Sequence, residues 1–376
     1  MNRASRRPIV IAMMDGFGPD YLEKSEMPAL KTMAAAGECK TVSGCMPAVT
    51  NVNNASICTG EWPAVHGITA NSYFDRATRQ EHYMNDGAML LAPTLFERAR
   101  SQGLRSALLT SKEKTVSLLG RGTELALAAE RPDAAWVARL GPAPDIYSAE
   151  INHWLWRAAG TILRERPEID LVYCHTTDYA MHMCDPDGEL SQRHLSAMDA
   201  LFADLLNEWP QLTFCLTADH GMSYKRRCYD LNKHMPAEGC PIYFAMSAER
   251  DPYIKHHRSF GGTAYVWLNR PEDLDHALGV LYATEGVEEA YGRQKAAEVF
   301  RLHPERIGDL VVTGDLDTVF GPMDSKYEDL PATYRNHGSR HELAVPLLAY
   351  GPRVDSSSWE RCTHNLDLLR LLRFDE

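Results

Sequence analysis

The 376-residue sequence predicts an α/β protein, with a doubly wound, mostly parallel sheet and a smaller α+β unit inserted into it. Short apolar runs alternate with stretches of helical periodicity through the first two-thirds of the chain, which is typical of βαβ units. One more buried-strand pattern lies near the C-terminus, and a different pattern separates the two parts. We therefore expect a core formed by residues 1–235 and 331–376, with residues 236–330 as the inserted unit.

The core pattern starts with residues 9–14, a continuous apolar run typical of a strand buried on both faces. Pro28 suits the first turn of a helix that Gly37 would end. Gly103 likewise ends a helical segment and precedes the next apolar run. The other expected strands are 104–110, 170–174, 212–216 and 345–350, and the expected helices are 28–37, 93–102, 149–166 and the segment with Leu195, Met198, Phe202 and Leu205.

The inserted unit is expected to fold as one compact α+β body between two core strands. A Gly-Gly pair at 261–262 precedes its first strand, and helices and strands then follow in alternation. The expected strands are 264–268, 287–291 and 309–313, and the expected helices are 271–283 and 294–300.

The composition is that of an ordinary globular protein, with 44% hydrophobic and 9% aromatic residues and a formal net charge of −12. This charge gives no reason to expect binding to nucleic acid or to an anionic membrane. No apolar stretch approaches the roughly 18 residues of a membrane-spanning helix. An acidic protein that turns over anions needs local positive charge, which bound metal ions would supply.

The cysteines and the N-terminal region indicate the compartment. Nine cysteines, an odd number without a C-x-x-C pair, are typical of reduced thiols in a cytosolic protein. The apolar run at 9–14 is too short for the hydrophobic region of a secretory signal. We therefore expect a soluble, cytoplasmic protein, and we leave its oligomeric state open, with a homodimer as one arrangement to test.

Carboxylates and imidazoles follow the ends of three expected core strands, and a further histidine stands in a His-Gly pair after residue 330. In open α/β sheets ligands bind outside the carboxyl ends of the strands, so these side chains should converge there. Each histidine alone could equally be a surface or core imidazole, but the combination indicates a site for two divalent metals. Such a pair suits displacement at a phosphoryl centre, because it holds both attacking and leaving groups. The residues are Asp15, Asp178, His182, Asp219, His220 and His337.

A hydroxyl residue, Thr50, follows a turn that contains Pro47 and precedes a helix-like segment. A helix N-terminus presents free N–H groups and a positive dipole end to a phosphoryl oxygen. A threonine hydroxyl is a poor nucleophile at neutral pH unless a base or a metal activates it, so a neighbouring metal would make Thr50 a candidate nucleophile. The alternative is a plain N-cap residue, with Asn53 and Asn54 solvating a turn.

Two lysines, Lys112 and Lys114, follow the expected strand 104–110. If the extended geometry of the strand continues, both side chains project from the same face and aim two cations at the crevice. Those cations would recognise an anionic group beyond the phosphoryl centre. The alternative is a pair of solvated lysines at the start of a helix.

With these residues assembled, the chain resembles the alkaline phosphatase superfamily, and within it the branch of nucleotide pyrophosphatase/phosphodiesterases and phosphonoacetate hydrolase. The likeness covers residues 8–120, 170–235 and 330–351, and the inserted unit matches only loosely, as a cap domain. The segment similar to the nucleophile loop of that branch is Thr50-Asn-Val-Asn53, Thr59-Gly60, and His66-Gly-Ile-Thr-Ala-Asn71-Ser-Tyr-Phe-Asp75.

The resemblance implies two zinc ions per chain. Donor sets of Asp and His without Cys suit zinc, and leave manganese or iron as alternatives. The resemblance places one zinc on Asp178, His182 and His337, and the other on Asp15, Asp219, His220 and the Thr50 hydroxyl.

Further roles follow from the same likeness. Asn71 stands where the branch has an amide donor to a phosphoryl oxygen. His341 is an alternative to His337 as the last ligand, and the His-Gly pair of the branch favours His337. Thr50 would attack phosphorus and form a phospho-threonine. The sequence leaves open which cap residues reach the crevice, and the candidates include His256, His257 and Arg258.

Lys112 and Lys114 resemble the lysine pair with which phosphonoacetate hydrolase holds the substrate carboxylate. Cleavage of a C–P bond expels carbon as something close to an enediolate dianion, and positive groups already in position would stabilise it. The resemblance therefore implies a two-zinc hydrolase that cleaves phosphonoacetate, a small anionic phosphonate, to acetate and phosphate. The alternatives are a phosphodiesterase or nucleotide pyrophosphatase, a phosphosugar mutase, and a catalytically inactive metal-binding protein.

Overall fold

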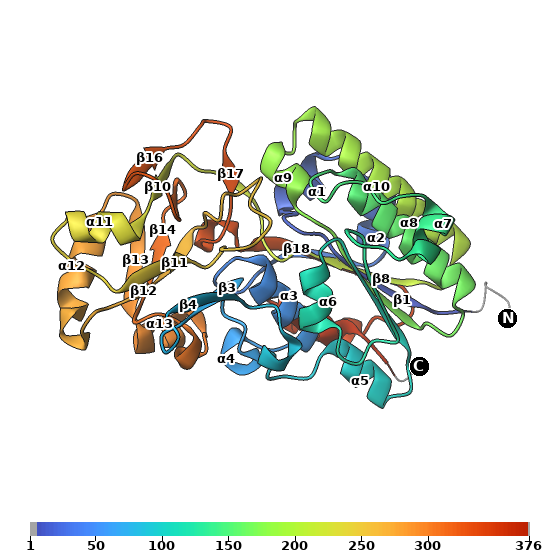
Figure 1. The fold of residues 1–376 in the computed structure, drawn as a ribbon. Coiled ribbons are helices and arrows are strands. Elements are labelled where there is room, and N and C mark those ends of the chain that lie inside the picture. Colours follow the sequence, from blue (N-terminus) through green and yellow to red (C-terminus); the bar gives the residue numbers. More distant parts are fainter. Residues whose placement is uncertain (1–5, 375–376) are drawn as a thin grey trace.

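The computed structural model describes residues 6–374, so residues 1–5 and 375–376 of the predicted core lie outside the described range. A large sheet with helices packed on it lies beside a second group of strands and shorter helices (Figure 1). Within the described residues the large sheet has seven strands, in the order β2 (Glu38–Ser43), β18 (Ala344–Tyr350), β8 (Thr213–Thr217), β1 (Ile9–Met13), β7 (Leu171–His175), β5 (Ser106–Thr110) and β6 (Leu125–Ala128).

The large sheet is mostly parallel, as the sequence predicts. The strands from β8 through β1, β7 and β5 to β6 all run parallel. At the other side, β18 is antiparallel to β8, and β2 is antiparallel to β18. The sequence pattern missed the outermost strands β2 and β6, because each is only partly buried and lacks a continuous apolar run.

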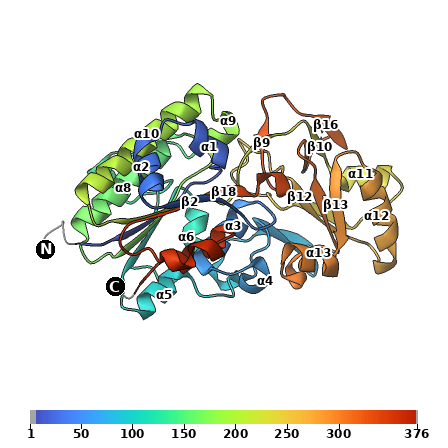
Figure 2. The same cartoon turned by 180° about the vertical axis from the view of Figure 1, so that it is seen from behind.

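Helices cover both faces of this sheet, as the two opposite views show (Figures 1 and 2). The doubly wound prediction is therefore confirmed. One face carries α1 (Pro19–Lys24), α2 (Pro28–Ala36), α8 (Glu150–Glu165) and α10 (Glu189–Glu208), with α7 (Ala134–Leu140) and α9 (Tyr179–Met183) beside them. The other face carries α3 (Thr50–Thr59), α5 (Leu95–Ser101) and α6 (Glu113–Leu119), with α4 (Pro63–His66) and the hairpin of β3 (Ser72–Asp75) and β4 (Gln80–Tyr83) beyond them.

Local chemistry sets the ends of these helices. Pro28 occupies the first turn of α2, and Gly37 is its C-cap residue, both as predicted. The helix predicted at 93–102 begins two residues later, because the Thr94 hydroxyl accepts a hydrogen bond from the N–H of Glu97. The Glu97 carboxylate in turn accepts the N–H of Thr94, which completes a capping box.

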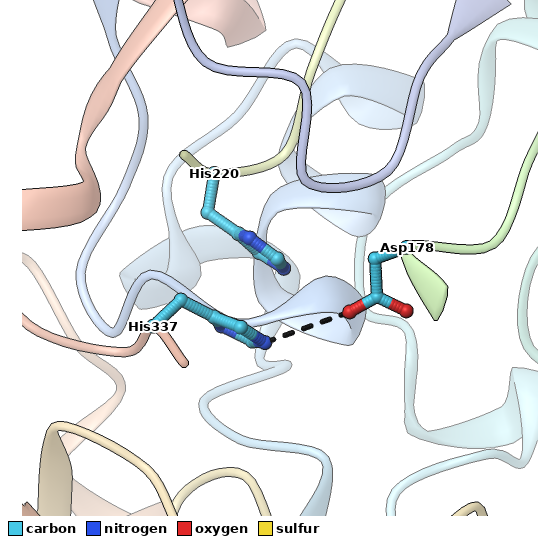
Figure 3. A group of neighbouring side chains, drawn as sticks. All are labelled: Asp178, His220 and His337. Atoms are coloured by element: carbon cyan, nitrogen blue, oxygen red, sulfur yellow. Dashed lines mark ion pairs between the residues drawn. The ribbon is translucent and has the colours of Figure 1, made fainter. Parts of the chain in front are cut away.

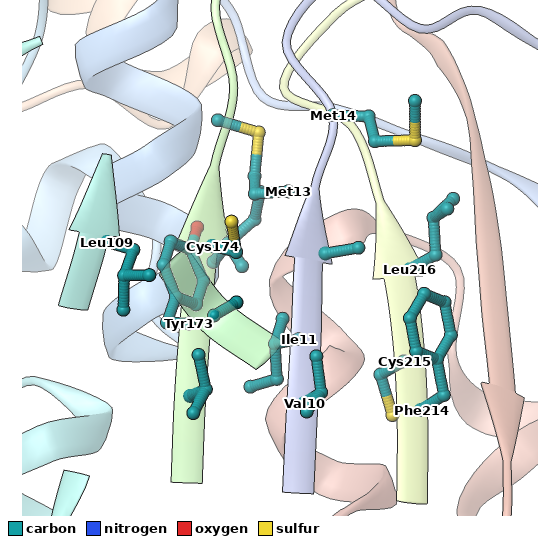
Figure 4. Close-up of a cluster of buried hydrophobic side chains, with 14 of the residues drawn as sticks. Val10, Ile11, Met13, Met14, Leu109, Tyr173, Cys174, Phe214, Cys215 and Leu216 are labelled. Atoms are coloured by element: carbon teal, nitrogen blue, oxygen red, sulfur yellow. The ribbon is translucent and has the colours of Figure 1, made fainter. Parts of the chain in front are cut away.

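The hydrophobic core of the sheet centres on β1. Every residue of this strand is fully buried, and Ile11 lies between Tyr173 of β7 and Cys215 of β8 in the register of the sheet. Figure 4 shows the apolar side chains of these strands in one continuous cluster. Burial on both faces explains why residues 9–14 form an unbroken apolar run instead of an alternating one.

The second group of strands lies between residues 223 and 336. Its main sheet is antiparallel, in the order β11 (Phe244–Ser247), β12 (Thr263–Trp267), β14 (Leu310–Gly314) and β13 (Val287–Gly292), with α12 (Leu274–Ala283) and α13 (Arg293–Phe300) beside it. A smaller sheet joins β10 (Arg227–Tyr229), β15 (Thr318–Phe320) and β16 (Tyr327–Asp329), and β9 (Ser223–Tyr224) pairs with β17 (Arg335–Asn336).

The limits of the inserted unit, at 236 and 330, stay a prediction. The helix α11 (Leu231–Ala237) crosses the first limit, and β10 lies before it while its partner strands lie after it. No helix in residues 6–374 combines the length and apolarity needed to cross a bilayer.

The position of Ile11 makes its side chain a test of the core. The substitution Ile11→Ala is expected to lower the free energy of unfolding by about 2–5 kcal/mol, because it leaves a cavity in the middle of a close-packed sheet. Urea unfolding measures this change. The control Val137→Ala, on the exposed side of α7, should stay within about 0.5 kcal/mol of the parent. A loss below about 1 kcal/mol for Ile11→Ala would contradict this packing.

Candidate metal centre

Neighbouring strands of the large sheet end level with one another. Met13 of β1 pairs with His175 of β7 and with Thr217 of β8, and Thr110 of β5 also pairs with His175. Because these strands are parallel, the loops that follow them start from the same edge of the sheet. The predicted site residues that follow these strand ends are Asp15, Lys112, Asp178, Asp219 and His220 in the loops and His182 in the short helix α9.

One group of potential ligands consists of Asp15, Asp219 and His220, whose donor atoms all lie within 4.8 Å of one another. His220 Nε2 lies 3.5 Å from Asp15 Oδ1 and 3.3 Å from Asp219 Oδ2. These three atoms are buried, and none has a hydrogen-bond partner among the described residues. Buried polar atoms without partners cost free energy, and a cation between them would satisfy all three.

A second group consists of Asp178, His220 and His337 (Figure 3). His337 Nε2 lies 3.8 Å from Asp178 Oδ2, and the rings of His220 and His337 stack with centroids 3.5 Å apart. His182 reaches the same carboxylate, with Nε2 2.8 Å from Asp178 Oδ2. The structure therefore brings together the three residues that the resemblance assigns to one zinc. The two groups share His220 and so form one continuous site.

The histidines His182, His220 and His337 each carry a proton on Nδ1. In each, Nδ1 lies within hydrogen-bond distance of a backbone carbonyl oxygen, which can only accept, so Nδ1 carries the proton. In His220 and His337 the lone pair of Nε2 then faces the carboxylates, whereas Nε2 of His182 lies 2.8 Å from Asp178 Oδ2 and, in the cation-free protein, donates a hydrogen bond to it. Metal-bound histidines are held in this way by their second nitrogen. The carbonyl oxygens are those of Arg335, Gly221 and Ala48, at 2.9, 3.0 and 2.7 Å respectively.

Burial sets the protonation of the site. Burial lowers the pKa of His220, and burial together with His220 and His182 lowers the pKa of His337 well below its ordinary value, so both rings are neutral near pH 7 and could act as ligands. Burial, followed by the charges of Asp15 and Asp178, raises the pKa of Asp219 well above its ordinary value. At Asp15 and Asp178, burial is outweighed by Lys112 and neighbouring histidines, which hold the pKa of both below their ordinary values, so the negative charge that the protein does not stabilise falls on Asp219, where a cation would stabilise it.

Lys112 offsets part of this charge. Its Nζ lies 3.3 Å from Asp15 Oδ2 and 3.4 Å from Asp178 Oδ1, between the two ligand groups. Lys114 pairs with Asp251 of the second group of strands. Both ammonium groups lie close to the ring of Tyr253, at 5.7 and 5.8 Å from its centroid.

The expected extended geometry of the two lysines is wrong, although both are buried at the site. The strand β5 ends at Thr110, Lys112 is the N-cap residue of α6, and Lys114 lies in its first turn. The two lysines therefore do lie at the start of a helix, but their side chains are buried at the site and not exposed to solvent. The turn between strand and helix, not a strand face, brings both Nζ atoms together.

Thr50 is the first residue of α3, and Val49 is its N-cap residue. The loop before Thr50 is tied to the candidate ligands, because Ala48 accepts the hydrogen bond from His337. Asn71 Oδ1 accepts the N–H of Asn51, 2.9 Å away, while Asn71 Nδ2 is buried and unpartnered among residues 6–374. Asn71 therefore holds the start of α3 and has a free amide donor, as its predicted role requires.

Two glycines explain the Asp-Gly and His-Gly pairs of the sequence. Gly16 has φ +74°, and a Cβ there would lie 3.1 Å from Cβ of Asp178. Gly338 has φ +112°, and a Cβ there would lie 2.6 Å from the backbone nitrogen of Gly262. Side chains at these positions would push the ligand loops apart.

The structure separates His337 from its alternative, His341. His337 is fully buried at the site, whereas His341 contacts Glu288 at the surface, with 3.0 Å between Nε2 and Oε2. Of the candidate cap residues, His256 reaches Asp178, and Arg258 instead forms an ion pair with Glu328. The metal and catalytic roles of all these residues remain predictions.

His175, which has no predicted role, is buried beside Asp15. The Asn54 amide donates to His175 Nδ1, 3.0 Å away, and Tyr173 holds that amide by donating to its oxygen. Nε2 of His175 therefore carries the proton and faces Asp15 Oδ2 at 3.4 Å. This tautomer is the opposite of that of His220 and His337, so His175, held by Asn54 of α3, orients the Asp15 carboxylate. Its place at the end of β7 was the only indication in the sequence.

Residues 9–341 match the family described as type I phosphodiesterase/nucleotide pyrophosphatase. The chain belongs to this family. With its structural neighbours, the family places the chain among the hydrolases of the alkaline phosphatase superfamily, whose members use divalent metals. The predicted superfamily is thus confirmed.

Curated relatives of this family match the chain at low identity. A bis(5'-adenosyl)-triphosphatase of Xenopus laevis is 25% identical over 58% of this chain and 48% of its own length. A venom phosphodiesterase of Naja atra is 24% identical over 57% of this chain and 26% of its own length. The chain thus spans about a quarter to a half of these relatives.

Solved structures match over nearly the whole chain. A phosphonoacetate hydrolase from Sinorhizobium meliloti 1021, solved with phosphonoacetate, has a TM-score of 0.86 and 30% identity, covering 96% of this chain and 94% of its own. Murine ectonucleotide pyrophosphatase/phosphodiesterase 5 has a TM-score of 0.69 and 17% identity, covering 97% and 93%. The second likeness supports the fold alone.

The raised pKa of Asp219 predicts that Asp219→Asn stabilises the protein when a chelator removes cations. A protonated Asp219 carboxyl costs little at low pH, but stability is lost as the pH rises through its raised pKa, and asparagine avoids this loss. We expect a gain of about 1–3 kcal/mol at pH 8 and a smaller gain at pH 5, measured by urea unfolding with chelator.

An added divalent cation should reverse this order, because a cation that binds at Asp219 would stabilise the parent and the variant lacks this carboxylate. The matched control Asp187→Asn, at an exposed surface ion pair, should leave both measurements nearly unchanged. If Asp219→Asn is less stable than the parent at pH 8 with chelator, the Asp219 carboxylate does not carry an unfavourable negative charge in the folded protein.

Proposed function

We propose that this protein is a zinc-dependent phosphonoacetate hydrolase, which cleaves phosphonoacetate with water to acetate and phosphate. The observation that carries the proposal is the pair of buried ammonium groups, on Lys112 and Lys114, beside the carboxylate–imidazole site. The carboxylate–imidazole site, with its cations, suits a phosphoryl centre. The two ammonium groups suit a carboxylate on the same small molecule. The 30% identity with a phosphonoacetate hydrolase over nearly the whole chain supports this substrate class.

Two zinc ions fit the donor atoms of the site. Asp and His donors without Cys suit zinc, and the buried oxygens and Nε2 atoms without partners among the described residues face the places where cations would lie. When bound, the ions stabilise negative charge on phosphoryl oxygens and lower the pKa of a coordinated hydroxyl or water. One ion would be held by Asp178, His182 and His337, and the other by Asp15, Asp219, His220 and Thr50.

Thr50 is the proposed nucleophile. Its Oγ forms a bond to phosphorus as the P–C bond breaks, and the electron pair of that bond leaves with carbon, which takes up a proton to become acetate. Water then cleaves the Thr50 phosphoester, which releases phosphate and restores the hydroxyl. The free Nδ2 of Asn71 donates to a phosphoryl oxygen in both steps.

The two lysines hold the substrate carboxylate in this proposal. As the P–C bond breaks, negative charge grows on the carboxylate oxygens, so ammonium groups already in place stabilise the transition state more than the substrate. Lys112 would exchange its contacts with Asp15 and Asp178 for the substrate once cations neutralise those carboxylates. Lys114 would keep its pairing with Asp251, which fixes its position.

A second candidate function is hydrolysis of nucleotide phosphodiesters or pyrophosphates. The family match over residues 9–341 favours it, because the family is described by those activities. Such an enzyme needs the same ligands and the same nucleophile, but it does not need two ammonium groups for a carboxylate.

We also propose a cytoplasmic location. All nine cysteines, which lie within residues 6–374, are free thiols, and most are buried. Free thiols persist in the reducing cytosol and are rarer in oxidising compartments.

Thr50→Ala is expected to lower kcat at least about 1,000-fold, because the covalent step loses its nucleophile. Zinc content, measured on the purified variant, should stay close to that of the parent, since the Asp and His ligands remain. The control Thr32→Ala, on the exposed side of α2, should retain parent activity. Full activity of Thr50→Ala would remove the covalent mechanism.

A substrate panel separates the two candidate functions. We expect the zinc-loaded parent to release phosphate from phosphonoacetate faster than from other phosphonates, and to hydrolyse diesters slowly. Lys112→Ala and Lys114→Ala should each lower kcat/KM for phosphonoacetate about 100-fold or more, and change diester hydrolysis far less. The exposed Lys295→Ala serves as control. Undiminished phosphonoacetate cleavage in both lysine variants, or preference for diesters, would favour the phosphodiesterase.

A further inference from the structure

The segment between β11 and β12 carries side chains of the second group of strands onto the metal centre. Asp251 pairs with Lys114, and the Tyr253 ring lies beside both lysines. A few residues further, His256 turns towards the ligand groups, with Nε2 3.6 Å from Asp178 Oδ1. This segment therefore closes one side of the site.

His256 has an unusual environment for a buried histidine. The residue is only 9% exposed, yet neither ring nitrogen has a hydrogen-bond partner within residues 6–374. Its ring packs edge-on against the rings of Tyr147 and Tyr179, with centroids 5.6 and 6.0 Å away, and against His182 at 4.7 Å. Leaving both nitrogens of a buried imidazole unused costs free energy, so a partner absent from the chain itself is indicated.

The distances fit a shared cation better than a hydrogen bond. Ligand atoms of Asp178, His182 and His256 all lie within 4.8 Å of one another. Two ligands of a tetrahedral zinc, each roughly 2.0–2.1 Å from the ion, lie roughly 3.3–3.5 Å apart. The 3.6 Å between His256 and Asp178 is close to that spacing and longer than a normal hydrogen bond.

We infer that His256 is an additional protein ligand at the Asp178/His182 cation site, supplied by the segment between β11 and β12. With Asp178, His182 and His337, it completes four protein ligands around one ion. The inference rests on the cation site of the proposed function, but not on its substrate.

His256 is also the ligand best suited to leave. The rings of His182 and His337 are each held by a carbonyl oxygen at Nδ1, whereas Nδ1 of His256 has no such partner in the part of the chain that the structure describes. A structural zinc site is closed by four protein ligands, and a catalytic one keeps a position for water or substrate. His256 would therefore fill the fourth position in this structure, and loss of its contact would open that position to water or substrate.

Cobalt titration of the chelator-treated protein tests this inference, because Co²⁺ replaces zinc and its visible absorption reports coordination. The parent is expected to bind two Co²⁺ ions per chain. His256→Ala and His256→Gln should each weaken one of the two at least about tenfold and alter its visible spectrum. Added imidazole should restore the spectrum of His256→Ala. Parent-like affinity and spectrum in both variants would overturn the inference, and so would a raised KM as the only change.

Arg258→Ala is the matched control, since Arg258 belongs to the same segment but pairs with Glu328 away from the site. It should bind both ions as the parent does, and equal weakening in this variant would mean that segment disorder, not ligand loss, causes the effect. Circular dichroism of the cation-free proteins checks the fold. If His256→Ala fails to fold, the titration of His256→Gln decides.

This experiment is independent of turnover. A parent that binds two cobalt ions through His256 but leaves phosphonoacetate intact would overturn the proposed substrate and keep the proposed ligand. A parent that cleaves phosphonoacetate while both His256 variants bind cobalt normally would keep the proposed substrate and overturn the proposed ligand.

Discussion

The repulsion between three buried carboxylates at one edge of the sheet is the constraint on which this structure depends. Asp15, Asp178 and Asp219 stand at the level ends of β1, β7 and β8, where no solvent screens them. A protein does not gather such charge without positive partners, because an unpaired buried charge costs several kcal/mol. Lys112 supplies one partner, and the neutral Nε2 atoms of the neighbouring histidines leave room for cations to supply the rest.

A rigid frame holds these charges in place. The central strands are buried on both faces, and the histidine rings are fixed by hydrogen bonds to backbone carbonyls that cannot rotate away. His175 does the same for the Asp15 carboxylate. Preorganised dipoles and charges need no rearrangement when negative charge appears on a reacting group. The same rigid frame therefore accounts for both the charge repulsion in the cation-free site and the suitability of the site for catalysis.

The large sheet and the segment after β11 contribute different groups to the site. In the proposed function, the large sheet provides the groups for phosphoryl chemistry, which phosphodiesterases and phosphonate hydrolases of the superfamily would share. The segment after β11 adds Asp251, Tyr253 and His256, which reach the lysines and Asp178. Substrate choice and access to the cations can therefore change through that segment while the sheet and its ligands stay the same.

The sequence by itself determined the elements whose signals are local. Fully buried strands such as β1 appear as apolar runs, Pro28 and Gly37 mark helix ends, and the Asp-Gly and His-Gly pairs mark the candidate ligand loops. Only the tertiary structure decided what depends on long-range contacts. These are the antiparallel direction of β18, the edge strands β2 and β6, the burial of His337 instead of His341, and the approach of His175 and His256 to the carboxylates. The reason is physical: hydrophobic periodicity and capping act over a few residues, whereas strand pairing and side-chain convergence join residues hundreds of positions apart.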